Sequence, residues 1–250
     1  MDSEIICDAS EEKTMTEDTT VSCYDDHAQA YDAYQFAAVP GYREMLDLAA
    51  EAARRYLSPD ARIIDLGCGT GNASLAVLGK MPSARIFLLD GSERMVSVAR
   101  EKISSAHPRA ILGYRVADLA ENWAEGLESE GYDCIVSTLV LEHLPLDRYR
   151  RAIEECFRLL KPGGWLIASE GYAEEGSDMR EWFFQEMEVR RRALDPKLSD
   201  FVAGLRGELE QHYYTSKARK AQWWQEAGFC SSAVLWQYLC IALMAGRKPL

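Results

Sequence analysis

The sequence predicts an α/β fold built on a doubly wound, mostly parallel sheet of seven strands. Short apolar runs alternate with amphipathic stretches of helical length between residues 61 and 171. A glycine-rich loop follows the first apolar run directly, and Lys161-Pro162-Gly163-Gly164 stops a helical stretch and opens the fifth run. Strands that alternate with helices are typical of βαβ units, whose strands are parallel. The 250 residues, 48% of them apolar, are enough to bury such a core.

The chain before the sheet is predicted to have two parts. Residues 1–20 hold seven acids, one lysine and few large apolar side chains, so we expect them to be disordered. In residues 21–60 tyrosines recur at helical spacing from Tyr24 through Tyr31, and a second helix is expected from Tyr42 to Tyr56. These two helices are expected to act as a lid over a ligand, or alternatively to pack on the sheet.

The core, residues 61–171, alternates strand and helix in order. A carboxyl-end loop follows each strand, and a helix returns the chain to the opposite edge of the sheet. The expected strands are 62–66, 85–89, 111–116, 134–138 and 165–169, with helices starting near 73 and spanning 92–104 and 146–160.

The alternation then stops. Residues 172–212 predict a helical cap inserted after the fifth strand, with helices at 179–194 and 198–211 broken by Asp195-Pro196. Residues 213–250 predict the last helix, 216–227, and a closing pair of strands, 233–236 and 239–245.

Charge and hydropathy narrow the class of protein. The net charge of −12 disfavours binding to nucleic acid, which usually requires a basic face. The longest apolar runs are too short to cross a bilayer, and the acidic start lacks the pattern of a secretory signal. We therefore expect a cytoplasmic protein that acts on a small molecule rather than on nucleic acid or a membrane.

The seven cysteines are scattered and form no CxxC pair. Several lie inside apolar strand or helix patterns, where a reduced cysteine behaves as a small hydrophobic residue. No cluster of cysteine and histidine has the short spacings of a zinc site, so we expect no metal.

Polar and glycine residues gather where the predicted strands end. The loop from Asp65 to Gly71 follows the first strand, Asp90-Gly91 the second and Asp118 the third, while Ser137-Thr138 ends the fourth. Ligands of doubly wound sheets bind outside these carboxyl ends. Glycines let the backbone approach a ligand, Asp90 is placed to accept both ribose hydroxyls, and Asp118 is placed to accept an adenine amino group.

Two cofactors that contain adenosine, NAD and S-adenosylmethionine, fit that description. The dinucleotide fingerprint needs a third glycine at the sixth position of its loop, which is Asn72 when counted from Gly67. The acidic Asp65 suits a cationic ligand such as S-adenosylmethionine better than it suits a pyrophosphate. The loop, Asp90, Asp118 and the later Gly163-Gly164 together favour S-adenosylmethionine.

These motifs resemble those of a known family. The segment from Asp65 to Gly71 is similar to motif I of the class I S-adenosylmethionine-dependent methyltransferases, and Leu160 to Gly164 resembles the segment before their fifth strand. The resemblance covers about residues 60 to 246 and implies a Rossmann-like sheet with an antiparallel last strand. It also implies S-adenosylmethionine as cofactor and S-adenosylhomocysteine as product.

Other segments resemble one branch, the carboxy-S-adenosylmethionine synthases of wobble-uridine modification, which use prephenate. They are Val39 to Tyr42, Arg206 to Glu210, Glu226 to Phe229 and Leu235 to Gln237. The resemblance implies a homodimer, and an Arg206 that meets the carboxylate of a carboxylated cofactor. With the motif I residues it gives the predicted cofactor-binding set of Tyr42, Asp65, Gly67, Cys68, Gly69, Gly71, Asp90, Gly91, Met95, Asp118, Leu119 and Thr138.

The loop departs from that branch. The synthases read Gly-Cys-Ser-Leu-Gly, whereas this chain has Gly69-Thr70 in place of the Ser-Leu pair. We therefore expect a methyltransferase with a small-molecule acceptor. The alternatives are a synthase or user of carboxy-S-adenosylmethionine, and a protein that binds S-adenosylmethionine without catalysis.

The acceptor side is less well defined. His143, just past the fourth strand, is a candidate general base, or else a histidine that packs or caps the next helix. Its neighbour Glu142 is expected to be solvated or to cap that helix. Tyr31 and Arg206 are the candidate substrate-binding residues. The bland alternative for Arg206 is a surface ion pair with Glu208 or Glu210.

Overall fold

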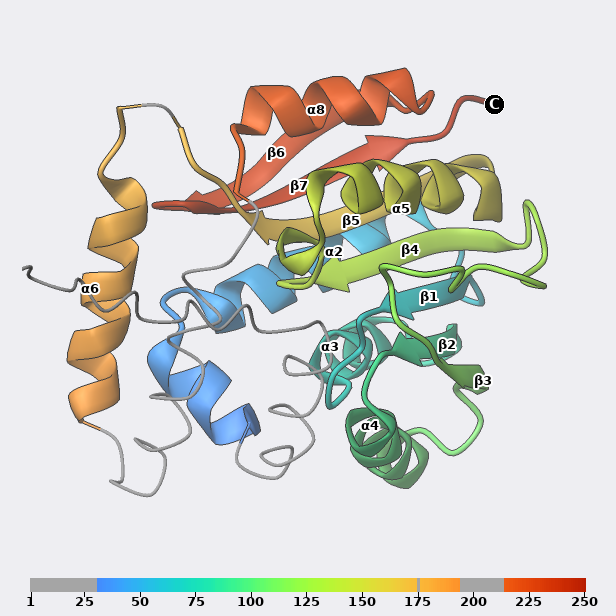
Figure 1. Ribbon diagram of the computed structural model, residues 1–250. Helices are drawn as coiled ribbons and strands as arrows, with labels where there is room; N and C mark the ends of the chain where they lie inside the picture. Colours follow the sequence, from blue (N-terminus) through green and yellow to red (C-terminus); the bar gives the residue numbers. More distant parts are fainter. Residues whose placement is uncertain (1–30, 175, 194–213) are drawn as a thin grey trace, which may run out of the picture.

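A seven-stranded sheet forms the centre of the protein (Figure 1). The computed structural model describes residues 31–174, 176–193 and 214–250. The strand order is β3-β2-β1-β4-β5-β7-β6, and β7 runs antiparallel to both of its neighbours while β1 to β5 pair in parallel. The strands are β1 (Arg62–Leu66), β2 (Arg85–Asp90), β3 (Ile111–Val116), β4 (Tyr132–Thr138), β5 (Leu160–Gly171), β6 (Cys230–Tyr238) and β7 (Ile241–Arg247). The predicted Rossmann-like class and the antiparallel last strand are confirmed.

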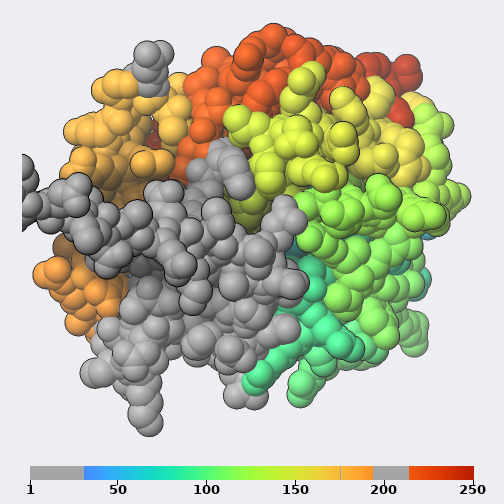
Figure 2. Space-filling model, viewed as in Figure 1, coloured from blue at the N-terminus to red at the C-terminus, as the bar shows by residue number. Residues whose placement is uncertain are grey.

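Helices cover both faces of this sheet. Residues 31–38 are helical, and the helices after them are α2 (Tyr42–Tyr56), α3 (Asn72–Lys80), α4 (Glu93–Ala106), α5 (Leu146–Leu159), α6 (Met179–Arg192) and α8 (Lys217–Glu226). Buried side chains of α2, α3 and α4 share one apolar cluster with the sheet, and those of α5 and α8 share the other. In Figure 2, α8 lies above α5, and the two helices pack against each other over the second face.

The core strands are apolar because both of their faces are covered. In β1, Ile63 to Leu66 are all buried, and β7 is buried from Ile241 to Gly246. A strand buried on both faces is expected to read as a continuous apolar run. The exception in β1 is Asp65, a buried carboxylate one residue before the end of the strand.

The fifth strand begins earlier than the sequence predicted. The predicted start was Trp165, but β5 starts at Leu160, directly after α5. Tyr132 pairs with Leu160 while Cys134 pairs with Trp165, so the Lys161 to Gly164 segment bulges out of the ladder. Gly163 has a φ of 79° at this bulge. A glycine-rich segment that forms a bulge inside a strand resembles a loop in sequence.

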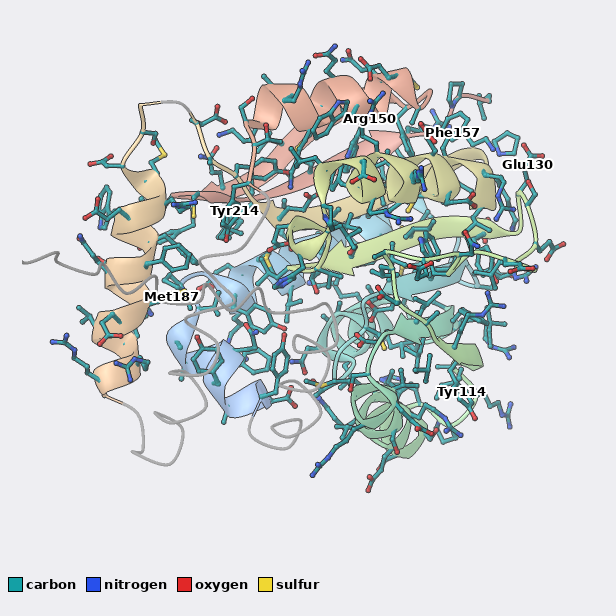
Figure 3. The ribbon with its side chains drawn as sticks, in the orientation of Figure 1. Tyr114, Glu130, Arg150, Phe157, Met187 and Tyr214 are labelled. Carbon is teal, nitrogen blue, oxygen red and sulfur yellow. The ribbon has the colours of Figure 1, made fainter. Side chains whose placement is uncertain are left out.

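Of the predicted cap 172–212, the structure describes residues 172–174 and 176–193, which include α6; this helix stands beyond the carboxyl ends of the strands (Figure 1). Its buried Met187 belongs to the same apolar cluster as α2, and Tyr214 lies between α6 and the end of the sheet (Figure 3). A Cβ added to Gly171 would lie 2.0 Å from the Tyr214 ring, so glycine at the end of β5 lets this ring pack on the backbone. The predicted disordered tail 1–20 and the predicted helix 198–211 lie outside the described residues.

None of the helices in the described ranges is long and apolar enough to cross a membrane.

Candidate active site at the carboxyl ends of the strands

The loop after β1 has a backbone that needs glycine. Gly67, Gly69 and Gly71 have φ values of 70°, 49° and 85°, in the left-handed region. A Cβ on Gly67 would lie 2.4 Å from the Val140 side chain, and one on Gly71 would lie 3.1 Å from Ala99. A side chain at Gly67 would therefore clash with Val140, one at Gly71 would crowd Ala99, and both would strain the backbone.

The end of β2 fixes this loop from the other side. The Leu89 carbonyl accepts from the backbone N–H groups of Gly67 at 2.7 Å and Cys68 at 2.9 Å. Asp90 Oδ2 accepts from the Gly69 N–H at 2.8 Å, and its Oδ1 accepts from the Ser92 N–H at 2.9 Å. The carboxylate predicted to hold the ribose thus also orients the loop.

Asp65 lies buried beneath the same loop. Its Oδ2 accepts from the backbone N–H and the hydroxyl of Ser74, at 3.1 and 2.5 Å, while Oδ1 has no hydrogen-bond partner among the described residues. Burial raises the pKa of Asp65 to about 6, although the two Ser74 hydrogen bonds act to lower it. A buried carboxylate with an unpaired oxygen next to a glycine cradle fits a ligand that carries a cationic group.

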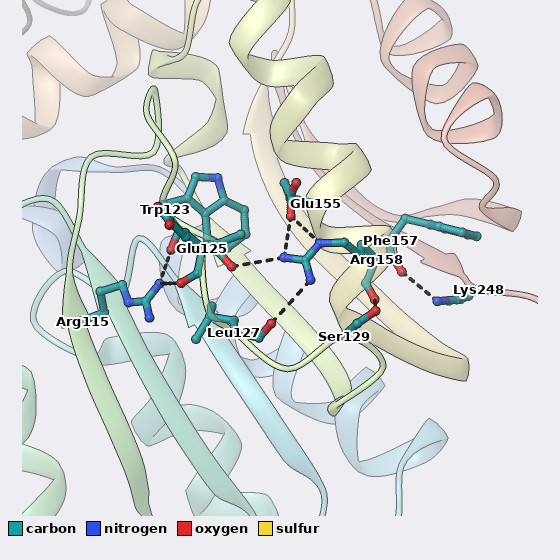
Figure 4. Close-up of polar contacts among 10 residues, drawn as sticks. Arg115, Trp123, Glu125, Leu127, Ser129, Glu155, Phe157, Arg158 and Lys248 are labelled. Carbon is teal, nitrogen blue, oxygen red and sulfur yellow. Dashed lines mark hydrogen bonds and ion pairs between the residues drawn. The ribbon is translucent and has the colours of Figure 1, made fainter.

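Two arginines hold the segment that follows Asp118 (Figure 4). Arg115 donates to the carbonyls of Trp123 at 2.8 Å and Glu125 at 2.7 Å, and Arg158 donates to that of Ala124 at 3.1 Å. The segment starts with exposed Asp118, whose Oδ1 accepts from the Ala120 N–H at 2.8 Å. Its carboxylate is therefore presented to solvent from a fixed backbone, beside the buried Leu119.

The remaining predicted cofactor residues surround the loop. Tyr42 is buried and its hydroxyl accepts from the Asn72 amide at 3.4 Å. Met95 is buried in α4, and its backbone N–H donates to the Ser92 hydroxyl at 3.0 Å. Gly91 and Thr138 are half-buried where β2 and β4 end. The predicted cofactor set thus lies at one edge of the sheet.

The cysteine in this set, Cys68, is unreactive. Cys68 is buried, and burial raises the pKa of its thiol well above the usual range, so it stays a thiol. Cys134, Cys156 and Cys240 are buried too, Cys230 is exposed, and these five described cysteines are all free. Cys7 and Cys23 lie outside the described residues. Among the described residues, no group of three or more His, Cys, Asp or Glu side chains could hold a metal ion.

On the acceptor side, Tyr31 and His143 occupy different positions. A Cβ on Gly69 would lie 3.8 Å from the Tyr31 ring, so Tyr31 covers the loop. His143 ends a short 3-10 helix, Leu141–His143, beyond β4. Burial of the imidazole lowers the pKa of His143 to about 4, a hydrogen bond with the Leu139 backbone acts to raise it, and the charge of Lys220 lowers it further. The imidazole is therefore neutral at physiological pH. Arg206 lies outside the described residues.

A buried charged cluster that sequence reasoning missed lies under the ends of β4 and β5. Lys220 of α8 donates to Glu170 Oε2 and to the Gly171 carbonyl, and both ionic side chains are almost wholly buried. Tyr149 donates to Glu170 Oε1 at 3.1 Å and accepts from the Trp224 indole at 2.8 Å. The only sequence signal was a lysine at an otherwise core-facing position of α8.

Glu142 belongs beside this cluster, and the expectation that it is solvated or caps α5 was wrong. It is 3% exposed, and its Oε2 has no partner among the described residues. Burial raises the pKa of Glu142 to about 8; the charge of Lys220 lowers it and that of Glu170 raises it. Glu142 is therefore mostly protonated at neutral pH, which lets a carboxyl occupy an apolar position.

Comparisons with known proteins agree with this geometry. Residues 63–164 match the family model described as a methyltransferase domain. The chain is 31% identical over 227 residues to a carboxy-S-adenosyl-L-methionine synthase of Shewanella amazonensis, which covers 84% of this chain and 86% of that protein. A synthase of the same name from Chromohalobacter salexigens is 29% identical, with coverages of 84% and 77%.

Solved structures share the fold at low identity. An O-methyltransferase family protein from Burkholderia thailandensis has a TM-score of 0.63 at 20% identity, covering 91% of this chain and 62% of its own. A Haemonchus contortus phosphoethanolamine N-methyltransferase, solved with S-adenosylhomocysteine, has a TM-score of 0.64 at 16% identity, with coverages of 90% and 58%.

The protein is thus a class I S-adenosylmethionine-dependent methyltransferase, an enzyme whose cofactor is S-adenosylmethionine. Within that class, the chain belongs to the family of the carboxy-S-adenosyl-L-methionine synthases.

Asp90→Ala should weaken binding of S-adenosylmethionine. It removes the predicted ribose acceptor and releases the Gly69 N–H, and each charge-assisted bond is worth about 1.5–3 kcal/mol. Titration calorimetry measures the change, with the exposed Asp60→Ala as control. An affinity equal to that of wild type would show that Asp90 does not hold the ribose.

Glu142→Gln should remove part of the pH dependence of folding. The pKa of Glu142 is about 8 in the folded protein, against an ordinary value of 4.5. The contribution of the protonated Glu142 to the free energy of unfolding is therefore complete below pH 4.5 and is lost as pH rises through 8. Urea unfolding at about pH 5.5 and about pH 8.5 should therefore show a smaller loss of stability in the variant than in wild type. The exposed Glu121→Gln is the control, and equal losses in wild type and Glu142→Gln would contradict the assignment.

Proposed function

We propose that the protein transfers the methyl group of S-adenosylmethionine to a small-molecule acceptor. The observation that carries this proposal is the loop Gly67 to Gly71, which has the ordinary methyltransferase pattern and uses all three glycines in the left-handed conformation. Gly69, with a φ of 49°, stands where the synthase pattern has serine, which is strained in that conformation. The loop thus favours an ordinary methyltransferase over a synthase.

The proposed roles follow from the geometry. Gly67 and Gly69 bring the backbone to the cofactor, Asp90 accepts the ribose hydroxyls, and Asp118 accepts the adenine amino group. Asp65 balances the positive charge of the cofactor from below the loop. The chemistry supplied by bound S-adenosylmethionine is a methyl group activated by its sulfonium, so the chain mainly has to position an acceptor in line with it.

Little base strength is available on the acceptor side. With a pKa of about 4, His143 is neutral and can accept a hydrogen bond from the acceptor, but it is a weak base. We propose that His143 orients the acceptor through a hydrogen bond and does not act as a general base, because its pKa is too low. An acceptor that is nucleophilic without deprotonation suits such a site best.

A cavity of about 260 Å³ lies beyond the end of β5, and its described lining includes neither His143, Tyr31 nor the proposed cofactor residues. We propose that it holds a charged part of the acceptor that extends away from the methyl group. The cavity is bounded by Tyr172, Arg180 of α6, Lys217 at the start of α8 and the β6–β7 turn at Cys240. Lys217 pairs with Glu174 at 3.1 Å, so one carboxylate faces two cations there. This excess of positive charge favours an acidic acceptor, and the net charge of −12 disfavours nucleic acid as the substrate.

We also propose that the protein is a cytoplasmic homodimer; this proposal rests on the resemblance and the sequence alone.

The second candidate is carboxy-S-adenosylmethionine synthesis, which the names of the relatives at 31% and 29% identity favour. Incubation of the purified protein with S-adenosylmethionine and prephenate, followed by mass spectrometry, separates the candidates. Carboxy-S-adenosylmethionine as product would replace the methyltransferase proposal. A metabolite screen that gives methylated product and S-adenosylhomocysteine would support it, and bound cofactor without any transfer would indicate a non-catalytic protein.

Arg206→Ala should impair the binding or turnover of an acidic ligand, because arginine binds a carboxylate through two parallel hydrogen bonds. The loss should be about tenfold in kcat/KM with an unchanged melting temperature. Arg190→Ala, an exposed position of α6, is the matched control. Wild-type kinetics in the Arg206 variant would contradict a role in ligand binding and support the alternative, a surface arginine.

A further inference from the structure

The Asp32 carboxylate joins three parts of the protein at the cofactor loop. Its Oδ1 accepts from the Asn72 amide at 2.8 Å and from the Thr70 hydroxyl. Its Oδ2 accepts from the Lys102 ammonium of α4 at 2.6 Å, and Lys102 also donates to Asn72 Oδ1 at 3.0 Å. Helix 31–38, the loop and α4 are thus connected through one half-buried carboxylate.

The neighbours of this network are the residues that enclose the loop. Tyr31, adjacent to Asp32, lies over Gly69, where an added Cβ would be 3.8 Å from its ring. The Asn72 amide that donates to Asp32 is also 3.4 Å from the Tyr42 hydroxyl. Movement of Asp32 would therefore displace the cover over Gly69 and one contact with α2.

Asp32 also supplies what the loop lacks locally. Gly71 is the N-cap of α3 and has no side chain to cap the helix. The carboxylate of Asp32 binds the side chains on either side of Gly71, where a negative charge is favourable at the start of a helix. One of those side chains is Thr70, at a position where this chain departs from the synthase loop.

We propose that Asp32 is a positioning residue of the cofactor site: its carboxylate clamps helix 31–38 onto the glycine loop, holding Tyr31 over Gly69, and the cofactor leaves only when this clamp opens. The proposal rests on the cofactor site proposed above. It assigns to residue 32 control of cofactor residence rather than direct contact with the cofactor.

The competing interpretation is an ordinary ion pair between Asp32 and Lys102, which would contribute little. The chain offers a matched control for it. Asp47 of α2 pairs with Lys80 of α3 at 2.8 Å, which is also a link from the N-terminal helices to α3, but at the far end of α3 from the loop. Of the two links, only that of Asp32 also includes a residue of the loop, because Asp32 accepts from the Thr70 hydroxyl as well as from Lys102.

The test is the dissociation rate of S-adenosylhomocysteine from the full chain, measured by surface plasmon resonance. Asp32→Asn should release it about tenfold faster, and Thr70→Val, which removes one of the bonds, should give a smaller increase. Asp47→Asn should stay within about twofold of wild type. Hydrogen exchange without ligand should be faster at residues 67–72 and 31–38 in Asp32→Asn, and unchanged there in Asp47→Asn.

The outcomes separate the clamp from the site. Tight binding by wild type with unchanged dissociation in Asp32→Asn and Thr70→Val would overturn the clamp and leave the site in place. No binding of S-adenosylhomocysteine by wild type would overturn the cofactor site and the clamp with it. An equal increase in the dissociation rate in the Asp32 and Asp47 variants would show that both residues act only as ordinary ion pairs. That result would also overturn the clamp. Should Asp32→Asn fail to fold, Thr70→Val alone decides.

Discussion

The first turn of the glycine loop is held by the carbonyl of Leu89, near the end of β2. This carbonyl accepts two successive N–H groups, from Gly67 and Cys68, and so fixes the first turn of the loop against the neighbouring strand. Asp90, the next residue, holds the following N–H at Gly69. The register of β1 against β2 therefore determines where α3 begins and where a bound nucleoside can lie, and the other strand ends are arranged around that point.

Much of the fold could be predicted because it depends on local pattern. The strands of the core are apolar runs, α2 and α5 are strongly amphipathic, and Ser92 caps α4 as its position suggested. The loop and the aspartates at the strand ends could be placed together because parallel strands present their carboxyl ends at one edge. The bulge at Lys161 to Gly164 could not, since its residues resemble those of a loop in any sequence.

Polar groups inside the fold were harder to predict. Glu142 and Lys220 are charged residues at positions where a solvated side chain is the usual outcome. Lys220 is buried in contact with Glu170, and the raised pKa of Glu142 lets its carboxyl be buried with a proton. Asp32 likewise has no local signal, because its partners Thr70, Asn72 and Lys102 come from distant parts of the chain. Burial of a carboxylate is tolerated only where a specific partner or a proton is present, and neither can be inferred from one sequence.

The place of β7 has a consequence for how the chain reaches its native state. This strand follows β6 in sequence but lies between β5 and β6 in the sheet. While the chain is being synthesised, β5 therefore has one unpaired edge until Ile241 to Arg247 emerge, and that edge includes the apolar residues Leu166 and Ile167. A long apolar edge is prone to pair with another chain, so delayed or incomplete synthesis of the last strand exposes this protein to aggregation. Completion of the sheet is thus a late, long-range step, which makes slow folding the expected behaviour of this topology.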